Sequence, residues 1–253
     1  MKRLEQDVDV CESRGAAAED APIARRSILK IAIAATAGFA VSPPALAASA
    51  KRPPKPENVL SPDSALDRLM KGNARYVEGV SRRHDFKHER EVLSKGQNPF
   101  AAVLSCADSR IAPEYCFDTA RGDVFVCRVA GNFASDEMVA SLEYAIQVLN
   151  TPLIMVLGHE ACGAVDATIK SIKDGTTLPG HLQSLVTALT PAVDAAQGAS
   201  GDLLANATLR NIMMNVEKLK GLPPILKTAV DDKKIRVVGG IYKLRSGRVE
   251  LVT

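Results

Sequence analysis

FAAVLSCADSR, residues 100–110, and LIMVLGHEACG, residues 153–163, are the two stretches that decide the fold. Each begins with a short apolar run and passes directly into a polar segment rich in small and reactive residues. Short runs that are apolar throughout are typical of strands buried on both faces of a parallel sheet. Residues 124–129 and 235–238 form two further runs of this kind.

A helix is expected between the second and third of these strands in chain order. Ser135 can cap it, and the apolar residues from Met138 to Leu149 recur at helical spacing. A strand, a helix and another strand imply parallel pairing, so the sequence predicts an α/β fold with a mainly parallel central sheet flanked by helices. Further helical patterns cover residues 62–78, 163–173, 181–197 and 203–219, and a turn at Ser246-Gly247 precedes a final strand.

The N-terminal segment has the architecture of an export signal. Arg25-Arg26-Ser27-Ile28-Leu29-Lys30 leads into an apolar run over residues 31–41, which is too short to span a bilayer, and Ala45-Leu46-Ala47 follows as a cleavage pattern. The paired arginines resemble a twin-arginine signal. We therefore expect residues 1–47 to be a signal peptide and the protein to be periplasmic or otherwise exported, with an ordinary secretory signal or an uncleaved anchor as the alternatives.

The composition fits a single globular domain after this signal. Prolines are concentrated in residues 48–60, which predicts an extended tether, and residues 61–253 are expected to form one folded domain. Lys and Arg total 32 against 29 for Asp and Glu, and a net charge of +3 gives no strong pull toward nucleic acid. No run reaches the ~18 apolar residues of a spanning helix, so we expect no stable membrane span in the mature form.

Four side chains at two strand ends form a candidate metal site. Cys106 and Asp108 follow one predicted strand, and His159 and Cys162 follow another. The carboxyl ends of parallel strands meet at one edge of a sheet, where ligands bind. Two thiolates, an imidazole and a carboxylate suit tetrahedral zinc, and a purely structural zinc site remains open on these residues alone.

Cys106-x-Asp108-Ser109-Arg110, together with Gly158-His159-x-x-Cys162-Gly163, resembles the signature of the β-class carbonic anhydrases. The resemblance extends over the predicted domain and includes Gln97-x-Pro99, Phe125-x-x-Arg128-x-x-Gly131-Asn132, Glu143-Tyr144-Ala145 and Gly239-Gly240-x-Tyr242. It implies a zinc lyase, carbonate dehydratase, with an N-terminal helix packing on a partner subunit. A homodimer or a dimer of dimers is implied as well.

The resemblance also assigns roles to residues. Cys106, His159 and Cys162 would hold Zn²⁺, and Asp108 would either bind the metal or be released to pair with Arg110. The implied reaction is the reversible hydration of carbon dioxide to bicarbonate and a proton by zinc-bound hydroxide.

A further group of residues is implied to bind substrate. Gln97 would donate a hydrogen bond to a substrate oxygen. Phe125 and Tyr144 would line an apolar slot for CO₂, with simple core packing as the alternative.

Two other functions remain open on the sequence. One is a related zinc hydrolase acting on carbonyl sulfide or carbon disulfide, and the other is a non-catalytic, zinc-stabilised binding protein with Asp108 permanently ligated. Arg128 is expected to bridge buried backbone or an interface and not to contact substrate. Cys116 and Cys127 are expected to be inert buried thiols, with a disulfide between them as the alternative, and residues 81–88 to be a solvated surface.

Overall fold

The computed structural model describes residues 59–252. The predicted signal peptide and all of the tether except residues 59 and 60 lie outside the described residues. Ser61 caps the first helix, and its hydroxyl accepts a hydrogen bond from the Ser64 amide.

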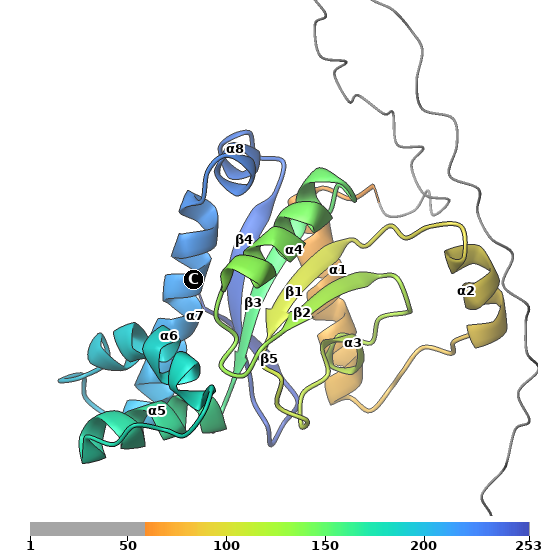
Figure 1. Ribbon diagram of the computed structural model, residues 1–253. Helices are drawn as coiled ribbons and strands as arrows, with labels where there is room; N and C mark the ends of the chain where they lie inside the picture. The colour runs from red at the N-terminus through yellow and green to blue at the C-terminus, as the bar shows by residue number, and fades with distance from the viewer. Residues whose placement is uncertain (1–58, 253) are drawn as a thin grey trace, which may run out of the picture. The chain divides into compact units, whose positions relative to one another are not determined.

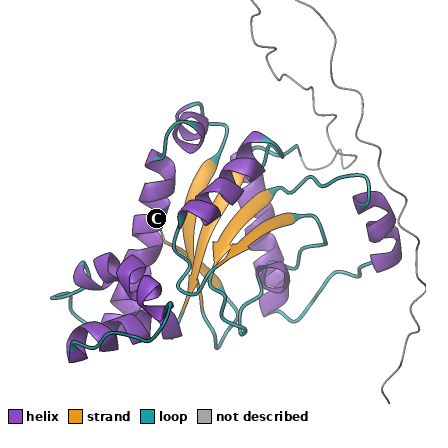
Figure 2. Ribbon diagram, viewed as in Figure 1, coloured by secondary structure: helices purple, strands orange, loops and turns teal. Residues whose placement is uncertain are grey.

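A five-stranded sheet in the order β2-β1-β3-β4-β5 forms the centre of the fold (Figure 2). Pairing is parallel among the first four strands, and β5 runs antiparallel to β4. The mainly parallel sheet predicted from the apolar runs is therefore confirmed. The strands are β1 (Ala101–Ser105), β2 (Val124–Arg128), β3 (Leu153–His159), β4 (Arg236–Tyr242) and β5 (Val249–Val252).

Helices cover both faces of this sheet (Figure 1). Alternate β1 side chains point to opposite faces: Ala102 and Leu104 pack with α4, α7 and α8, whereas Ala101 and Val103 pack with α1 and α3. The helices are α1 (Pro62–Val77), α2 (Phe86–Leu93), α3 (Pro113–Cys116), α4 (Asp136–Gln147), α5 (Gly163–Asp174), α6 (Leu182–Asp194), α7 (Leu203–Gly221) and α8 (Ile225–Asp231).

A third apolar cluster lies beyond the carboxyl ends of the strands. It joins Cys106 and Cys162 to residues of α5, α6 and α7, among them Val165, Leu189 and Ala207. These three helices therefore close one end of the sheet with apolar side chains around the two cysteines.

The helix α2 was not predicted, because it is only eight residues long and its three apolar residues are Phe86, Val92 and Leu93. None of its residues is buried, and Asp85 caps it by accepting from the His88 amide. The solvated character expected for residues 81–88 is consistent with this exposure, but part of the stretch is helical. No helix within residues 59–252 is long and apolar enough to cross a membrane.

Cys116 and Cys127 are free thiols, so the predicted unpaired state is confirmed for the structure. Cys116 is buried under α1, and burial raises its pKa to about 12. Both residues lie outside the cluster of Cys106 and Cys162.

Candidate metal centre

Three elements bring the candidate ligands to the carboxyl end of the sheet. Cys106 directly follows β1, His159 is the last residue of β3, and Cys162 is the N-cap of α5. The sharp turn between β3 and α5 places Ala161 at φ 49°, a left-handed conformation that is uncommon for a residue with a side chain. This bend in the backbone directs the side chains of His159 and Cys162 toward the same point.

The three ligand atoms form a tight and buried group. The two Sγ atoms and a ring nitrogen of His159 all lie within 4.8 Å of one another, and the two Sγ atoms are 4.0 Å apart. Cys106 is 3% exposed, and Cys162 and His159 are completely buried. The predicted convergence of two distant segments is therefore present in the fold.

The chemistry of this group fits zinc. His159 Nδ1 lies 2.8 Å from the carbonyl oxygen of Glu160, which assigns the proton to Nδ1 and leaves a lone pair on Nε2. Nε2 is buried and has no hydrogen-bond partner among the described residues. A buried imidazole lone pair facing two sulfurs is costly unless a cation accepts it, and this donor set is one that zinc prefers.

Contact between the two sulfurs shifts the pKa values of both cysteines. Pairing with the Cys162 thiol lowers the pKa of Cys106, against the opposing effect of burial. The same pairing, with burial, raises the pKa of Cys162. Burial lowers the pKa of His159, but attraction to Cys106 outweighs it and the pKa is raised. Contact between the two sulfurs therefore favours the thiolate form of Cys106 over that of Cys162.

Asp108 is held beside this group by Arg110. Arg110 Nε donates to Asp108 Oδ1 at 2.9 Å and Nη2 donates to Oδ2 at 2.7 Å, so the pair is bidentate. This hydrogen bonding holds the pKa of Asp108 well below its usual range. Asp108 Oδ2 is 3.8 Å from His159 Nε2, and Arg110 Nη2 also donates to the Ala161 carbonyl at 3.1 Å. The carboxylate therefore lies beside the three ligands, bound to the guanidinium.

Arg128 fixes the loop that carries these residues. Its Nε donates to the Cys106 carbonyl at 2.9 Å, and its Nη2 donates to the carbonyls of Asp108 and Ile111 at 2.7 and 2.8 Å. The expected bridging of backbone is confirmed, because Arg128, at the end of β2, ties β2 to the loop after β1.

Gly131 contacts the site in a way that the sequence analysis missed. Its backbone N–H donates to Cys106 Sγ at 3.3 Å. Gly131 has φ +86°, and a Cβ there would lie 2.8 Å from Leu189 Cδ1, so both conformation and space require glycine. A glycine shortly after the strand next to β1 was the available signal.

The three residues assigned to substrate binding lie away from their own metal centre. Gln97 is exposed and precedes β1, whereas Cys106 follows that strand. Phe125 pairs with Ala102 near the start of the edge strand β2, and its ring centroid is 6.3 Å from that of Tyr144 on α4. Tyr144 is 47% exposed. Within one chain, the structure does not bring these residues to the ligand cluster.

Comparisons with known proteins agree with this geometry. A sequence profile described as carbonic anhydrase matches residues 101–249. The chain is 35% identical to carbonic anhydrase 2 of Mycobacterium tuberculosis over 192 residues, covering 76% of this chain and 93% of that protein. Identity is also 35% to a carbonic anhydrase of Mycolicibacterium smegmatis, with the same coverage.

Solved structures place the fold in the same group. The structure of the β-carbonic anhydrase CcaA matches with a TM-score of 0.59 and 27% identity, covering 74% of this chain and 95% of that chain. A tetrameric β-carbonic anhydrase from Sordaria macrospora has the same fold, with a TM-score of 0.59 at 22% identity over 75% of this chain and 97% of that one. On these grounds the chain belongs to the β-carbonic anhydrase family.

Proposed function

We propose that this carbonic anhydrase carries out its lyase reaction, the reversible hydration of CO₂ to bicarbonate and a proton, at a zinc ion held by Cys106, His159 and Cys162. The observation that carries the assignment is the buried meeting of two sulfurs with a partnerless His159 Nε2. Zinc bound there would supply Lewis acidity, which makes water nucleophilic near neutral pH.

Asp108 and Arg110 would act on the nucleophile and not on the fold. Arg110 holds both oxygens of Asp108, so the carboxylate stays ionised and is kept from the three ligands. An ionised carboxylate beside the metal centre can accept a hydrogen bond from the attacking oxygen and orient it. Arg128 would keep Asp108 in place through its backbone bonds to that loop.

The two other functions considered from the sequence are less well supported. A non-catalytic site closed by four protein ligands requires Asp108 at the metal, yet Asp108 is paired with Arg110. A hydrolase of carbonyl sulfide or carbon disulfide has no separate support, because the named relatives are carbonic anhydrases.

Metal analysis combined with kinetics tests the proposal. The purified chain from residue 48 onward is expected to contain about one zinc per chain and to hydrate CO₂ in stopped-flow assays. Removing the metal with a chelator should abolish hydration, and adding Zn²⁺ should restore it. A metal-free protein with undiminished activity would rule the proposal out.

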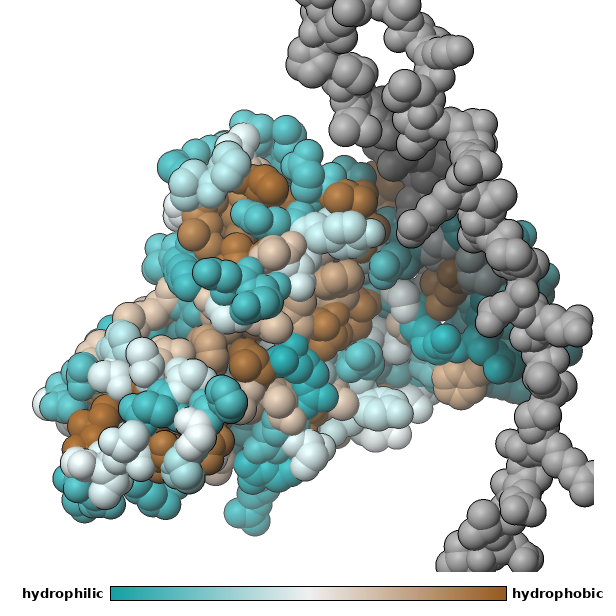
Figure 3. All heavy atoms as spheres, viewed as in Figure 1, coloured by the Kyte–Doolittle hydropathy of each residue, from teal (hydrophilic) through white to brown (hydrophobic). Residues whose placement is uncertain are grey.

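We also propose that Gln97, Phe125 and Tyr144 serve the site of a neighbouring subunit in a homodimer or dimer of dimers. They lie away from the cluster of their own chain, and large apolar side chains on α1, α2, α3 and α4 remain exposed, namely Tyr76, Phe86, Tyr115, Tyr144 and Val148. Figure 3 shows apolar surface on the side of the molecule that carries α4. Exposed apolar area of this kind favours association with a second copy.

Subunit mixing tests this arrangement. A Gln97→Ala/Tyr144→Ala chain keeps the ligand cluster, and a Cys162→Ser chain keeps the substrate residues. Each homo-oligomer is expected to be nearly inactive. A purified heterodimer of the two should regain activity, because one of its sites then has every residue intact. No regain would mean that all these residues act within one chain.

For the N-terminal segment we propose twin-arginine export of the folded, zinc-loaded protein, with periplasmic localisation. Export in the folded state would allow the reduced thiols of Cys106 and Cys162 to bind metal before they reach an oxidising compartment. Arg25→Lys/Arg26→Lys is expected to block export, whereas Arg52→Lys in the tether is not. Unchanged export of the double variant would contradict this route.

A further inference from the structure

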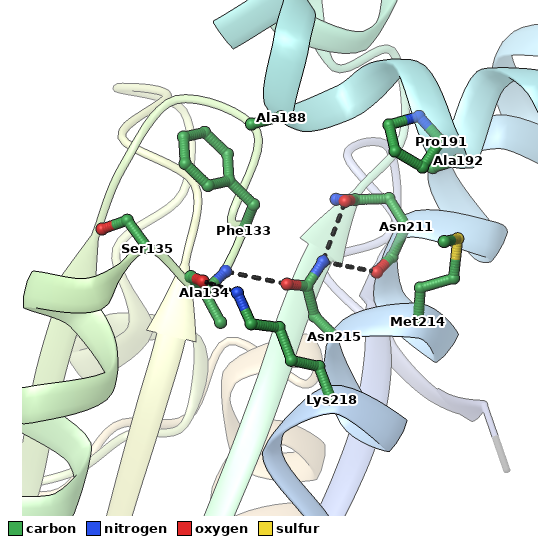
Figure 4. Close-up of a pocket in the computed structure, with 10 residues that line it drawn as sticks. All are labelled: Phe133, Ala134, Ser135, Ala188, Pro191, Ala192, Asn211, Met214, Asn215 and Lys218. Carbon is green, nitrogen blue, oxygen red and sulfur yellow. Dashed lines mark hydrogen bonds between the residues drawn. The ribbon is translucent and has the colours of Figure 1, made fainter. Parts of the chain in front are cut away.

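One face of α7 presents two buried asparagines to the interior, and the exposed Lys218 continues the same face. Asn211, Asn215 and Lys218 follow one another at helical spacing, and the two asparagines are 2% and 8% exposed. They line a cavity of about 390 Å³ between α6, α7 and the loop that leads into α4 (Figure 4). Buried side-chain amides are almost always hydrogen-bonded, so the partners of Asn211 and Asn215 indicate what these residues hold in place.

The hydrogen bonds run in one direction along this face (Figure 4). The Ala134 amide donates to Asn215 Oδ1 at 2.8 Å, and Asn215 Nδ2 donates to Asn211 Oδ1 at 2.9 Å. Asn211 Nδ2 then donates to the Gly131 carbonyl at 2.8 Å. Lys218 Nζ holds the other side of the loop through the Ala134 carbonyl at 2.6 Å. The α7 face thus fixes both ends of the loop from Gly131 to Ala134.

The chain of bonds ends one residue from the metal centre. Gly131 accepts from Asn211 through its carbonyl and donates to Cys106 Sγ through its own N–H. Only the two backbone torsions of Gly131 separate these groups, and glycine has no Cβ to restrict those torsions. Holding the carbonyl therefore holds the direction of the N–H.

We propose that Asn211, supported by Asn215, is a positioning residue that aims the Gly131 N–H at Cys106 Sγ and so sets the electron donation of that sulfur to the metal. The inference rests on the proposed role of Cys106 as a metal ligand. A hydrogen bond to a ligating sulfur withdraws electron density from that sulfur. Residues that hydrogen-bond to the ligands therefore change the properties of the metal site without touching the metal.

Asparagine suits this position because it both accepts and donates. Its Oδ1 accepts a hydrogen bond from Asn215 Nδ2, and its Nδ2 donates one to the Gly131 carbonyl. Leucine has nearly the same volume and shape, carries no charge, and makes neither bond. Asn206 offers a matched control on the same helix, because its Nδ2 donates to the Ser200 carbonyl at 3.0 Å, in a loop outside the metal centre.

The experiment compares Asn211→Leu with Asn206→Leu in Co²⁺-substituted and zinc-free protein. In Asn211→Leu the thiolate-to-Co²⁺ charge-transfer band should move to lower energy, and zinc affinity in chelator competition should differ from that of the wild type by about 10–100-fold. Asn206→Leu should keep the wild-type band and affinity. Asn211→Ser, whose side chain is too short to reach Gly131, should shift the band in the same direction and serves if the leucine variant does not fold.

A purely structural role for Asn211 predicts a different pattern. Thermal stability would fall, but the folded Asn211→Ser protein would keep the wild-type band energy and bind zinc within about twofold of wild type, and that result would overturn the inference. A wild-type protein that takes up Co²⁺ without any thiolate band would instead refute the assignment of Cys106. The two failures are therefore distinguishable.

Discussion

Cys162→Ser is expected to lose zinc affinity by at least about 100-fold. Substituting a residue that only hydrogen-bonds to a metal ligand already lowers metal affinity by about 10–100-fold. Serine is close in size to cysteine, so the buried site keeps its shape. Its hydroxyl is far less acidic than a thiol and replaces the soft donor with a hard, neutral one. CO₂ hydration should fall in parallel, as measured by stopped flow, with zinc content measured by elemental analysis.

Cys116→Ser supplies the matched control for this loss. Cys116 is as buried as Cys162, but its Sγ donates to the Ala112 carbonyl and lies outside the ligand group. The control should retain zinc and activity even if its melting temperature drops. Equal zinc content in Cys162→Ser and Cys116→Ser would refute the three-ligand centre.

The sheet and the ligand cluster were accessible from sequence because their signals are local. Four apolar runs identified the parallel strands, and the polar residues after two of them identified the edge at which Cys106, His159 and Cys162 meet. Because β1 and β3 are parallel neighbours, their carboxyl ends lie side by side, and this brings the residues that follow them together.

What the sequence did not reveal depends on contacts without a local pattern. The helix α2 is only eight residues long and buries none of them, so its local sequence pattern is too short to predict a helix. Gly131 acts through its backbone N–H, a donor that every residue type except proline carries. Asn211 sits in a helix whose polar residues are taken by default as solvent-facing, although it is 2% exposed. Such roles follow only from the three-dimensional arrangement.

Asp108→Asn separates catalysis from metal binding. The three ligands remain, so zinc content should match wild type, while kcat for CO₂ hydration should fall by about 10²–10⁴-fold, the usual contribution of a positioned acid–base group. The asparagine amide is neutral, offers one acceptor oxygen instead of two, and cannot form the bidentate pair with Arg110. It would thus fail to orient the attacking oxygen.

Asp118→Asn is the control, because it breaks an equivalent aspartate–arginine pair away from the centre. Arg75 Nε lies 2.6 Å from Asp118 Oδ2. Burial opposes ionisation of Asp118, but Arg75 and the Arg82 amide outweigh it and lower its pKa. That carboxylate therefore stabilises the fold above the unfolded pKa of about 3.9, and the benefit disappears as the pH falls through the folded pKa.

Asp118→Asn should therefore lose thermal stability, whereas Asp108→Asn should lose catalytic turnover. Asp118→Asn should melt earlier than wild type near neutral pH, with a difference that narrows in acid, and should keep kcat. Asp108→Asn should keep its zinc and lose turnover. If Asp108→Asn hydrates CO₂ as fast as Asp118→Asn does, the carboxylate beside the metal centre has no orienting role, and the bidentate pair with Arg110 serves only to hold the loop between β1 and α3.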